Sequence, residues 1–219
     1  MKVVFGSHNP SKVELYKSLF KPYNINIVGL DEINVHIDVE EDGVRPHDNA
    51  ILKATAYSKA LNCPVIADDS GLFFDSCVPS ELQPKSKIRR VNNRVLSDDE
   101  ALDYYQGMVE KYGTMCSEPY DEYVEPYKRL YGYYEKAVAL CFNGNTYTCD
   151  YQVPKYYINK KSTKRNVGFP LDSMSITPAF NKVTVNLTEE DNEILFKEES
   201  KDLVASISTW ADILKSNNK

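Results

Sequence analysis

The sequence lacks the features of a membrane protein and of a disulfide-stabilised protein. No stretch approaches the roughly 18 consecutive apolar residues that cross a bilayer. The five cysteines are odd in number and form no Cys-x-x-Cys pair, which favours free thiols over disulfides or structural zinc. The apolar start of the chain is too soon interrupted by polar residues to be a signal peptide. These absences predict a soluble cytoplasmic protein with no membrane partner.

Histidine and positive charge are also scarce. The three histidines never occur at His-x-x-x-His spacing, so a histidine-built metal site is not expected. The formal net charge of −6 leaves no basic surplus to neutralise nucleic-acid phosphates, which predicts no nucleic-acid partner. A small polyphosphate ligand stays possible, because one local cluster of lysines can bind it. The excess carboxylates could hold a hard divalent cation.

The order of apolar patterns in the first third of the chain is typical of an α/β fold. Short β-branched runs predict strands at 2–5, 25–30, 35–39 and 65–67. Helical spacing predicts helices at 11–20 and 47–61. In α/β folds ligands bind at the carboxyl ends of strands, and the polar clusters at 6–12, 40–43 and 68–71 fall there.

The remaining two thirds of the chain carry fewer signals. Residues 98–111 and 203–214 show helical spacing, and 182–187 is a candidate strand. Asn143-Gly144 between two apolar runs predicts a hairpin. The tyrosine-rich stretch 117–135 is interpreted as an irregular or helical excursion. No repeat or linker divides the chain, so we expect a single domain over 1–219.

The first candidate site follows the first strand. Asn9 can cap the next helix and Pro10 suits its first position. A helix N-terminus attracts phosphate, and Lys12 would add a full positive charge there. The second glycine and the Gly-Lys-Ser/Thr ending of a P-loop are missing. An ordinary turn with a surface lysine is the alternative.

Two further clusters lie on the next loop and helix. In Glu40-Glu41-Asp42-Gly43 only Glu40 or Glu41 can face a given cleft, because side chains alternate along an extended backbone. Asn49 and Lys53 are four residues apart and share one helix face. A solvated turn and a lysine reaching into solvent are the alternatives.

Asp68 and Asp69 form the strongest cluster. They follow the short apolar strand 65–67, which would hold them rigidly, as a metal ligand or general base requires. Alternation points them to opposite faces, so one would be catalytic and the other structural. A plain Asp-Ser-Gly turn is the competing interpretation.

Taken in order, these motifs resemble a known family. Ser-x-Asn-x-x-Lys, Glu-Glu-x-Gly, Asn-Ala-Ile-Leu-Lys-Ala and Ile-Ala-Asp-Asp-Ser-Gly-Leu closely resemble the inosine/xanthosine triphosphate pyrophosphatases over residues 1–75. The resemblance implies an α/β fold with a long mixed β-sheet forming two lobes, flanking helices and an active-site cleft between the lobes. It also implies a homodimer. One lobe would comprise about 1–76 plus the C-terminal helix, with a tyrosine-rich insertion at about 104–135.

The resemblance also implies roles for single residues. Side chains on the substrate phosphates would be Ser7, Asn9, Lys12, Lys53 and Ser70. Glu40 and Asp69 would bind Mg²⁺, and Asp69 would also position or deprotonate the attacking water. Magnesium and lysines would offset the charge of the triphosphate.

The C-terminal half departs from the family. Phe169 and Asp172 stand where the base is stacked and read, but Pro170 and Leu171 replace the usual glycine and tyrosine. The Ser-His-Arg triplet and the Pro-Gly-x-x-Ser-Ala-Arg segment are missing. The sequence therefore predicts a Mg²⁺-dependent enzyme that cleaves a nucleoside triphosphate to monophosphate and pyrophosphate with altered base specificity. The alternatives are an ordinary ITP/dITP/XTP pyrophosphatase and an inactive nucleotide-binding or interaction protein.

Overall fold

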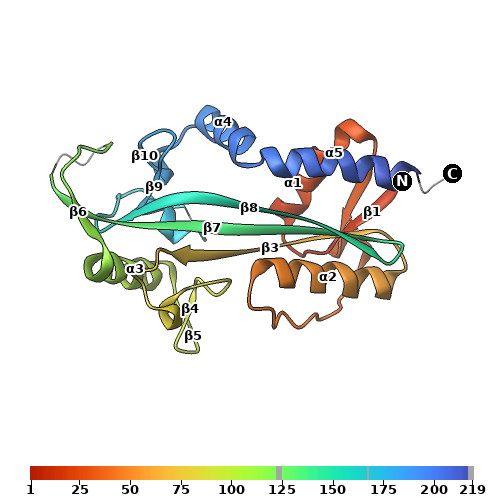
Figure 1. Ribbon diagram of the computed structural model, residues 1–219, viewed down its shortest axis with the longest axis horizontal. Helices are drawn as coiled ribbons and strands as arrows, with labels where there is room; N and C mark the ends of the chain where they lie inside the picture. The colour runs from red at the N-terminus through yellow and green to blue at the C-terminus, as the bar shows by residue number, and fades with distance from the viewer. Residues whose placement is uncertain (122–124, 167, 217–219) are drawn as a thin grey trace. The chain divides into compact units, whose positions relative to one another are not determined.

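The computed structural model describes residues 1–121, 125–166 and 168–216 (Figure 1). Its contacts divide the chain into two compact units. The first unit comprises Met1–Ser70, Lys136–Tyr151 and the chain from Ser200 onward, and the second comprises Gly71–Glu135 and Gln152–Glu199. The predicted phosphate and metal residues therefore lie in the first unit, and the predicted base-binding residues Phe169 and Asp172 lie in the second.

The strands of the described chain form one large mixed sheet of eight strands, as predicted. They are β1 (Lys2–Phe5), β2 (Asn26–Gly29), β3 (Val65–Phe74), β6 (Thr114–Cys116), β7 (Tyr127–Phe142), β8 (Asn145–Ile158), β9 (Ser175–Thr177) and β10 (Lys182–Val183). The order is β10-β9-β8-β7-β3-β1-β2, with β6 paired to β7. β1 runs parallel to β2 and β3, whereas β9 is antiparallel to β8 and β10.

Five α-helices accompany this sheet within the described residues. They are α1 (Pro10–Phe20), α2 (Pro46–Leu61), α3 (Asp98–Tyr112), α4 (Glu189–Glu199) and α5 (Lys201–Ser216). Short 3₁₀ turns include η2 (Asp31–Ile33) and η4 (Pro170–Ser173), and β4 (Arg90–Val91) and β5 (Arg94–Val95) form a small ribbon. Within the described ranges, no helix has both the length and the apolar character needed to cross a bilayer.

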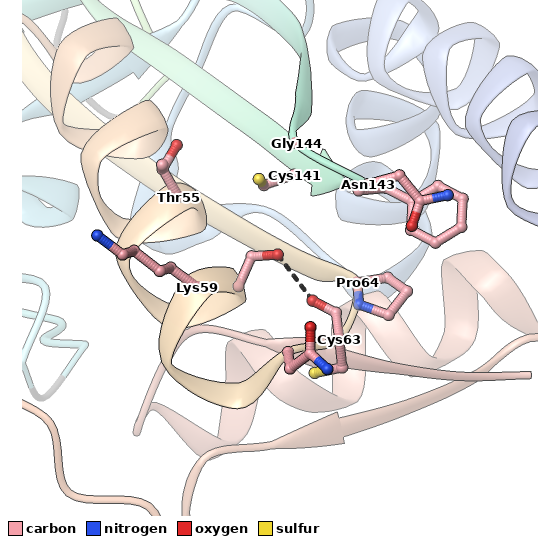
Figure 2. A pocket seen from close by; sticks show the side chains of 10 residues that line it. Thr55, Lys59, Cys63, Pro64, Cys141, Asn143 and Gly144 are labelled. Carbon is pink, nitrogen blue, oxygen red and sulfur yellow. Dashed lines mark hydrogen bonds between the residues drawn. The ribbon is translucent and has the colours of Figure 1, made fainter.

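The hairpin predicted at Asn143-Gly144 joins β7 to β8. Both turn residues have positive φ, 50° for Asn143 and 75° for Gly144, as the Asn-Gly hairpin turn requires. This turn and the C-terminal end of α2 line a cavity of about 470 Å³ (Figure 2). Cys63 and Cys141 are among its lining residues, whereas none of the predicted site residues is.

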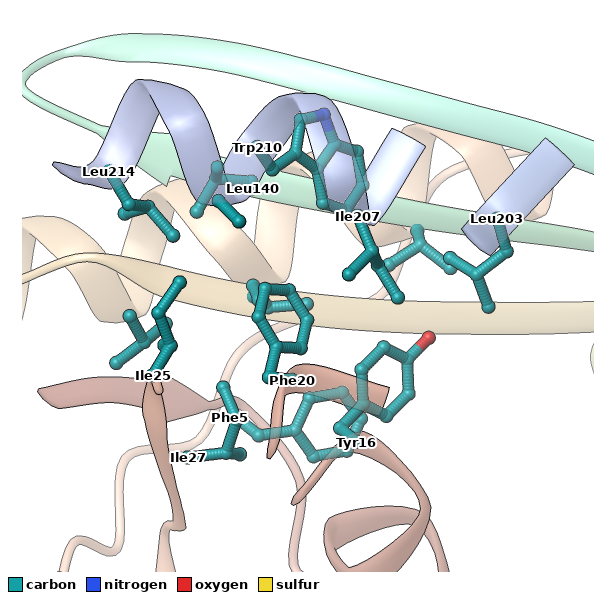
Figure 3. Close-up of a cluster of buried hydrophobic side chains, with 14 of the residues drawn as sticks. Phe5, Tyr16, Phe20, Ile25, Ile27, Leu140, Leu203, Ile207, Trp210 and Leu214 are labelled. Atoms are coloured by element: carbon teal, nitrogen blue, oxygen red, sulfur yellow. The ribbon is translucent and has the colours of Figure 1, made fainter. Parts of the chain in front are cut away.

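An apolar cluster holds β1, α1 and α5 of the first unit together (Figure 3). Phe5 and Phe20 are fully buried, and the ring of Tyr16 stacks on that of Phe5 with centroids 4.2 Å apart. Trp210 and Ile207 of α5 belong to the same cluster, which confirms the closing helix predicted from their spacing. The cluster fixes the start of α1, where the first predicted site begins.

A separate cluster forms the core of the second unit. It includes Leu72 and Phe74 of β3, Tyr105 of α3 and Tyr157 of β8. Phe74 and Tyr157 meet edge to face with centroids 5.3 Å apart. Burial raises the pKa of the Tyr105 hydroxyl, so this ring acts as a neutral core residue.

Three secondary-structure predictions are wrong. Much of the stretch 117–135 is strand, because β7 already begins at Tyr127; residues 122–124 of the predicted insertion lie outside the described chain. Residues 35–39 have no regular secondary structure and pair with no strand of the described chain. In 182–187 only the first two residues are strand, and a 3₁₀ turn follows. In addition, β3 runs on to Phe74, so Asp68 and Asp69 lie within the strand and do not follow it.

Candidate functional site

The turn between β1 and α1 presents three of the predicted phosphate-binding side chains. Asn9 is the N-cap of α1: its Oδ1 accepts hydrogen bonds from the backbone N–H groups of Ser11 (3.0 Å) and Lys12 (3.4 Å). The hydroxyl oxygen of Ser7 accepts one from the backbone N–H of Asn9 (3.1 Å). Because the cap already satisfies two helix amides, a phosphate here would be met chiefly by side-chain donors: the Ser7 hydroxyl, the Asn9 amide and the Lys12 ammonium.

Lys12 is held against the middle of β3. Its Nζ donates to Oδ1 of Asp68 at 2.9 Å, and the two side chains are 37% and 18% exposed. The ammonium group of α1 and the carboxylate of β3 are therefore brought together across 56 residues of sequence. The pair is accessible enough for Lys12 to exchange this partner for a phosphate.

Lys53 and Asp69 form the more buried ion pair. Lys53 Nζ lies 3.2 Å from Oδ1 of Asp69 and 3.0 Å from Oε2 of Glu41. The side chains of Lys53 and Asp69 are only 12% and 11% exposed. Burial by itself lowers the pKa of Lys53, but the charges of Asp69 and Glu41 outweigh it and leave the pKa raised. The lysine is therefore a fixed cation at neutral pH.

Asn49 joins the acidic turn to Asp69. This residue is 1% exposed, its Nδ2 donates to Oδ2 of Asp69 at 3.0 Å, and its Oδ1 accepts from the backbone N–H of Gly43 at 2.8 Å. A Cβ added at Gly43 would lie 2.4 Å from that Oδ1, so only glycine fits this contact. The glycine of the Glu-Glu-Asp-Gly turn is thus explained by close packing on Asn49.

We expect Asn49→Ala to lower the free energy of unfolding by about 1–3 kcal/mol, because it leaves the Gly43 N–H and one Asp69 oxygen without their buried partner. Urea unfolding followed by tryptophan fluorescence measures the change. Thr55→Ala, at an exposed position of the same helix, is the matched control and should change little. Equal stability of the two variants would contradict this account of Asn49.

The first unit brings most of the predicted phosphate and metal residues onto neighbouring elements. Lys12 and Lys53 each contact one of the two adjacent aspartates of β3, and Ser70 follows them on the same strand. Glu40 and Glu41 are both exposed, and Glu41 is the acid that contacts Lys53. Alternation left the choice between Glu40 and Glu41 open, the family resemblance assigned the metal to Glu40, and Asn49 was given no role of its own. The spacing of Asn49 and Lys53 on one helix face was the available signal.

The predicted base-binding residues lie in the second unit: Phe169 immediately precedes η4, and Asp172 is part of it. Phe169 is 67% exposed, so its side chain is accessible to solvent. The Asp172 carboxylate accepts a hydrogen bond from Nδ2 of Asn166 at 2.9 Å. Burial raises the pKa of Asp172, although the bond from Asn166 acts in the opposite direction.

Comparison with known proteins supports the resemblance found in the N-terminal motifs. Residues 3–108 match the Ham1 family. The chain is 41% identical over 75 residues to a dITP/XTP pyrophosphatase of Bacillus subtilis, covering 34% of this chain and 38% of that protein. A Staphylococcus aureus dITP/XTP pyrophosphatase is 45% identical over 71 residues, covering 32% of this chain and 35% of that protein. The chain thus matches less than half the length of these relatives.

Solved structures extend the likeness to the whole fold. The Ham1 protein of Staphylococcus aureus has a TM-score of 0.72 and 21% identity, covering 99% of this chain and 100% of its own. A Coxiella burnetii HAM1 protein has the same TM-score with 20% identity and 99% of each chain covered. The resemblance predicted from the motifs is confirmed: the sequence match is confined to the N-terminal segment, and the fold is shared throughout.

Proposed function

We propose that this chain, which resembles the Ham1 family, hydrolyses a nucleoside triphosphate to the monophosphate and pyrophosphate. A water oxygen attacks the α-phosphorus, the bond from that phosphorus to the bridging oxygen breaks, and pyrophosphate leaves. Asp69 accepts the proton of the water. Lys12, Lys53, Ser7 and Asn9 bind the phosphate oxygens, with the hydroxyl of Ser70 beside them. The relatives named dITP/XTP pyrophosphatase support this reaction class.

The observation that carries the proposal is the pairing of two lysines with two adjacent aspartates. Lys12 of α1 contacts Asp68 and Lys53 of α2 contacts Asp69, so two adjacent carboxylates of β3 each hold one ammonium group. An incoming triphosphate can take over the ammonium groups, and this leaves Asp69 free to accept the proton of the water. Such preorganised charge is the main means by which proteins stabilise a phosphoryl-transfer transition state.

The charge balance of this cluster favours a divalent cation as a further component. Lys12 and Lys53 face three acids, Asp68, Asp69 and Glu41, so the cluster is already negative before a triphosphate arrives. Its donors are all carboxylate oxygens, and Mg²⁺ is usually bound through one or two carboxylates together with substrate phosphates and water. We propose Asp69 as one ligand and Glu40, which precedes Glu41 on the same exposed turn, as the other. Bound there, Mg²⁺ would neutralise charge on the phosphates and acidify the attacking water.

For the base we propose altered specificity relative to deaminated purines. The match to the Ham1 family ends at residue 108, well before the base-recognition stretch at Phe169 and Asp172. In that stretch Pro170 and Leu171 are both buried and form a 3₁₀ turn, which leaves Phe169 as the exposed aromatic surface. A deaminated-purine specificity is the second candidate, favoured by the names of the relatives.

Pyrophosphate release from a panel of standard, deaminated and modified nucleoside triphosphates tests this proposal. We expect Mg²⁺-dependent pyrophosphate, not orthophosphate, with a preference that extends beyond ITP, dITP and XTP. Activity confined to those three would establish the second candidate.

Asp172→Asn keeps the shape of the side chain. It should change the ratio of kcat/KM between two bases at least tenfold while leaving pyrophosphate binding unchanged. The predicted homodimer and cytoplasmic location stay predictions.

A further inference from the structure

A second group of metal-ligating side chains lies beside the phosphate turn. His8, Asp31 and His36 each offer a ligand atom, and these atoms lie within 4.8 Å of one another. Nδ1 of His8 is 2.5 Å from Oδ1 of Asp31. The rings of His8 and His36 are nearly parallel, at 6°, with centroids 5.8 Å apart. All three side chains are exposed to solvent, and none belongs to the site described above.

The backbone under these three residues is anchored. The N–H of Leu30 donates to the carbonyl of Ser7 (3.4 Å), which ties the segment before Asp31 to the residue before His8. The N–H of Val35 donates to the carbonyl of Leu30 (3.0 Å), and the Tyr57 hydroxyl donates to the carbonyl of Ile37 (3.1 Å). His36 is therefore held from both sides by bonded neighbours.

The alternation of side chains in the same segment explains why His36 is exposed. Val35, Ile37 and Val39 pack on the cluster around Leu30 and Tyr57, so the residues between them face solvent. The alternation that the sequence analysis interpreted as a strand thus presents His36 outward without a partner strand. Because all three side chains are exposed, they have room to rotate toward a shared metal ion.

We propose that His8, Asp31 and His36 form a binding site for a transition-metal ion of the zinc class. Two imidazoles and one carboxylate are a donor set that Zn²⁺ and its neighbours favour, whereas Mg²⁺ prefers oxygen donors alone. Tetrahedral zinc with bonds near 2.0–2.1 Å places its ligand atoms about 3.3 Å apart. The contact between His8 and Asp31 must therefore widen by less than about 1 Å, which exposed side chains allow.

Three protein ligands leave one coordination position open. His8 stands between Ser7 and Asn9, two of the residues that we propose to bind phosphate, so the open position lies next to the phosphate turn. A phosphate oxygen is then a suitable fourth ligand. This consequence rests on the proposed function, but the metal site itself does not.

The spacing of the histidines in the sequence does not reveal this site, because no two of them stand at His-x-x-x-His spacing. His8 lies in the β1–α1 turn, Asp31 begins η2, and His36 lies in the segment that follows η2. Only the fold brings the three residues together. The prediction that the chain has no histidine-built metal site is therefore replaced by this proposal.

The test is a Zn²⁺ titration of the untagged full chain by calorimetry, in excess Mg²⁺ and with the exposed thiol of Cys77 replaced by Cys77→Ser. We expect one Zn²⁺ per chain, with His8→Ala and His36→Ala each lowering the affinity at least tenfold. His47→Ala is the matched control: His47 also contacts a carboxylate, that of Asp150 at 2.8 Å, but has no second histidine beside it. This variant should bind Zn²⁺ like the parent.

NMR signals of the imidazole rings give an independent measurement. The chain has only three histidines, so the signal of each can be assigned with single-histidine variants. Zn²⁺ should shift the signals of His8 and His36 and leave those of His47 unchanged. Unaltered Zn²⁺ binding in the double variant His8→Ala/His36→Ala would overturn the proposal. Asp69→Asn must retain Zn²⁺ binding whether or not it is inactive on nucleotides, so failure of this site and failure of the proposed function are distinguishable.

Discussion

Asp69→Asn is expected to lower kcat for pyrophosphate release by about 10²–10⁴-fold, the range seen when a general base is removed. The substitution keeps the size of the side chain, and its amide oxygen can still accept from Nδ2 of Asn49. What is lost is the negative charge beside Lys53 and the ability to accept a proton from water. Steady-state assays with saturating Mg²⁺ and nucleotide measure the loss, and thermal unfolding checks that the fold is retained.

Asp68→Asn is the matched control for this prediction, because it makes the same change one residue earlier on the same strand. Asp68 contacts Lys12 and is more exposed than Asp69, so its substitution should cost no more than about tenfold, by mispositioning Lys12. Loss of activity in Asp68→Asn with Asp69→Asn nearly unaffected would reverse the roles of the two aspartates.

Comparison of the parent protein with Asp69→Asn also decides between an enzyme and an inactive nucleotide-binding protein. If the parent protein and Asp69→Asn bind nucleotide equally and neither releases pyrophosphate from any triphosphate, the chain is a binding protein. The contacts favour an enzyme, because Asp69 is buried and held by both Asn49 and Lys53. A surface that only binds a triphosphate gains nothing from a buried carboxylate placed among its cations.

Local signals predicted the parts of the fold that short-range chemistry determines. Asn9 caps α1 as expected, because its side chain reaches only the amides of the next two or three residues. Asn143-Gly144 forms the hairpin turn, because few other pairs tolerate two positive φ angles. Such features depend on a handful of neighbouring atoms, so they can be recognised without knowledge of the tertiary structure.

The wrong predictions concern segments whose structure depends on distant partners. The tyrosines after residue 126 form part of β7, where Arg129 pairs with Thr114 of β6. Tyrosine favours strands, but the neighbouring Pro and Glu residues hid that preference. Conversely, Val35 to Val39 alternate like a strand yet pair with no strand of the described chain. Strand formation is a property of pairs of segments, and the partner is not visible in either segment alone.

The candidate site likewise contains parts that local sequence predicts and parts that depend on tertiary contacts. The elements that carry Lys53 and Asp69 could be predicted from motifs, because each motif is local. The contacts of Asn49 with both Gly43 and Asp69, and the choice of Glu41 at Lys53, depend on how the acidic turn packs onto α2. Alternation could show only that one of the two glutamates faces inward.

Lys53→Met is expected to reduce both stability and catalysis. It removes the cation from two carboxylates, Asp69 and Glu41, and breaking one side of a buried ion pair costs about 3 kcal/mol of unfolding free energy. Loss of a preorganised positive group at the phosphates should lower kcat/KM by about 10²-fold. Lys12→Met is the control, because the more exposed pair of Lys12 and Asp68 should contribute no more than about 1 kcal/mol.

The pH dependence of the Lys53 effect has a definite sign. Folding raises the pKa of Lys53 above its ordinary value of 10.5, so its contribution to stability is complete below that pH. The contribution disappears as the pH rises through the folded-state value, where the ammonium group loses its proton. Urea unfolding should therefore show the full difference between the parent and Lys53→Met at pH 7, and a smaller one only in strongly alkaline solution. A difference that is already lost near pH 8 would mean that Lys53 is not the cation that Asp69 and Glu41 hold.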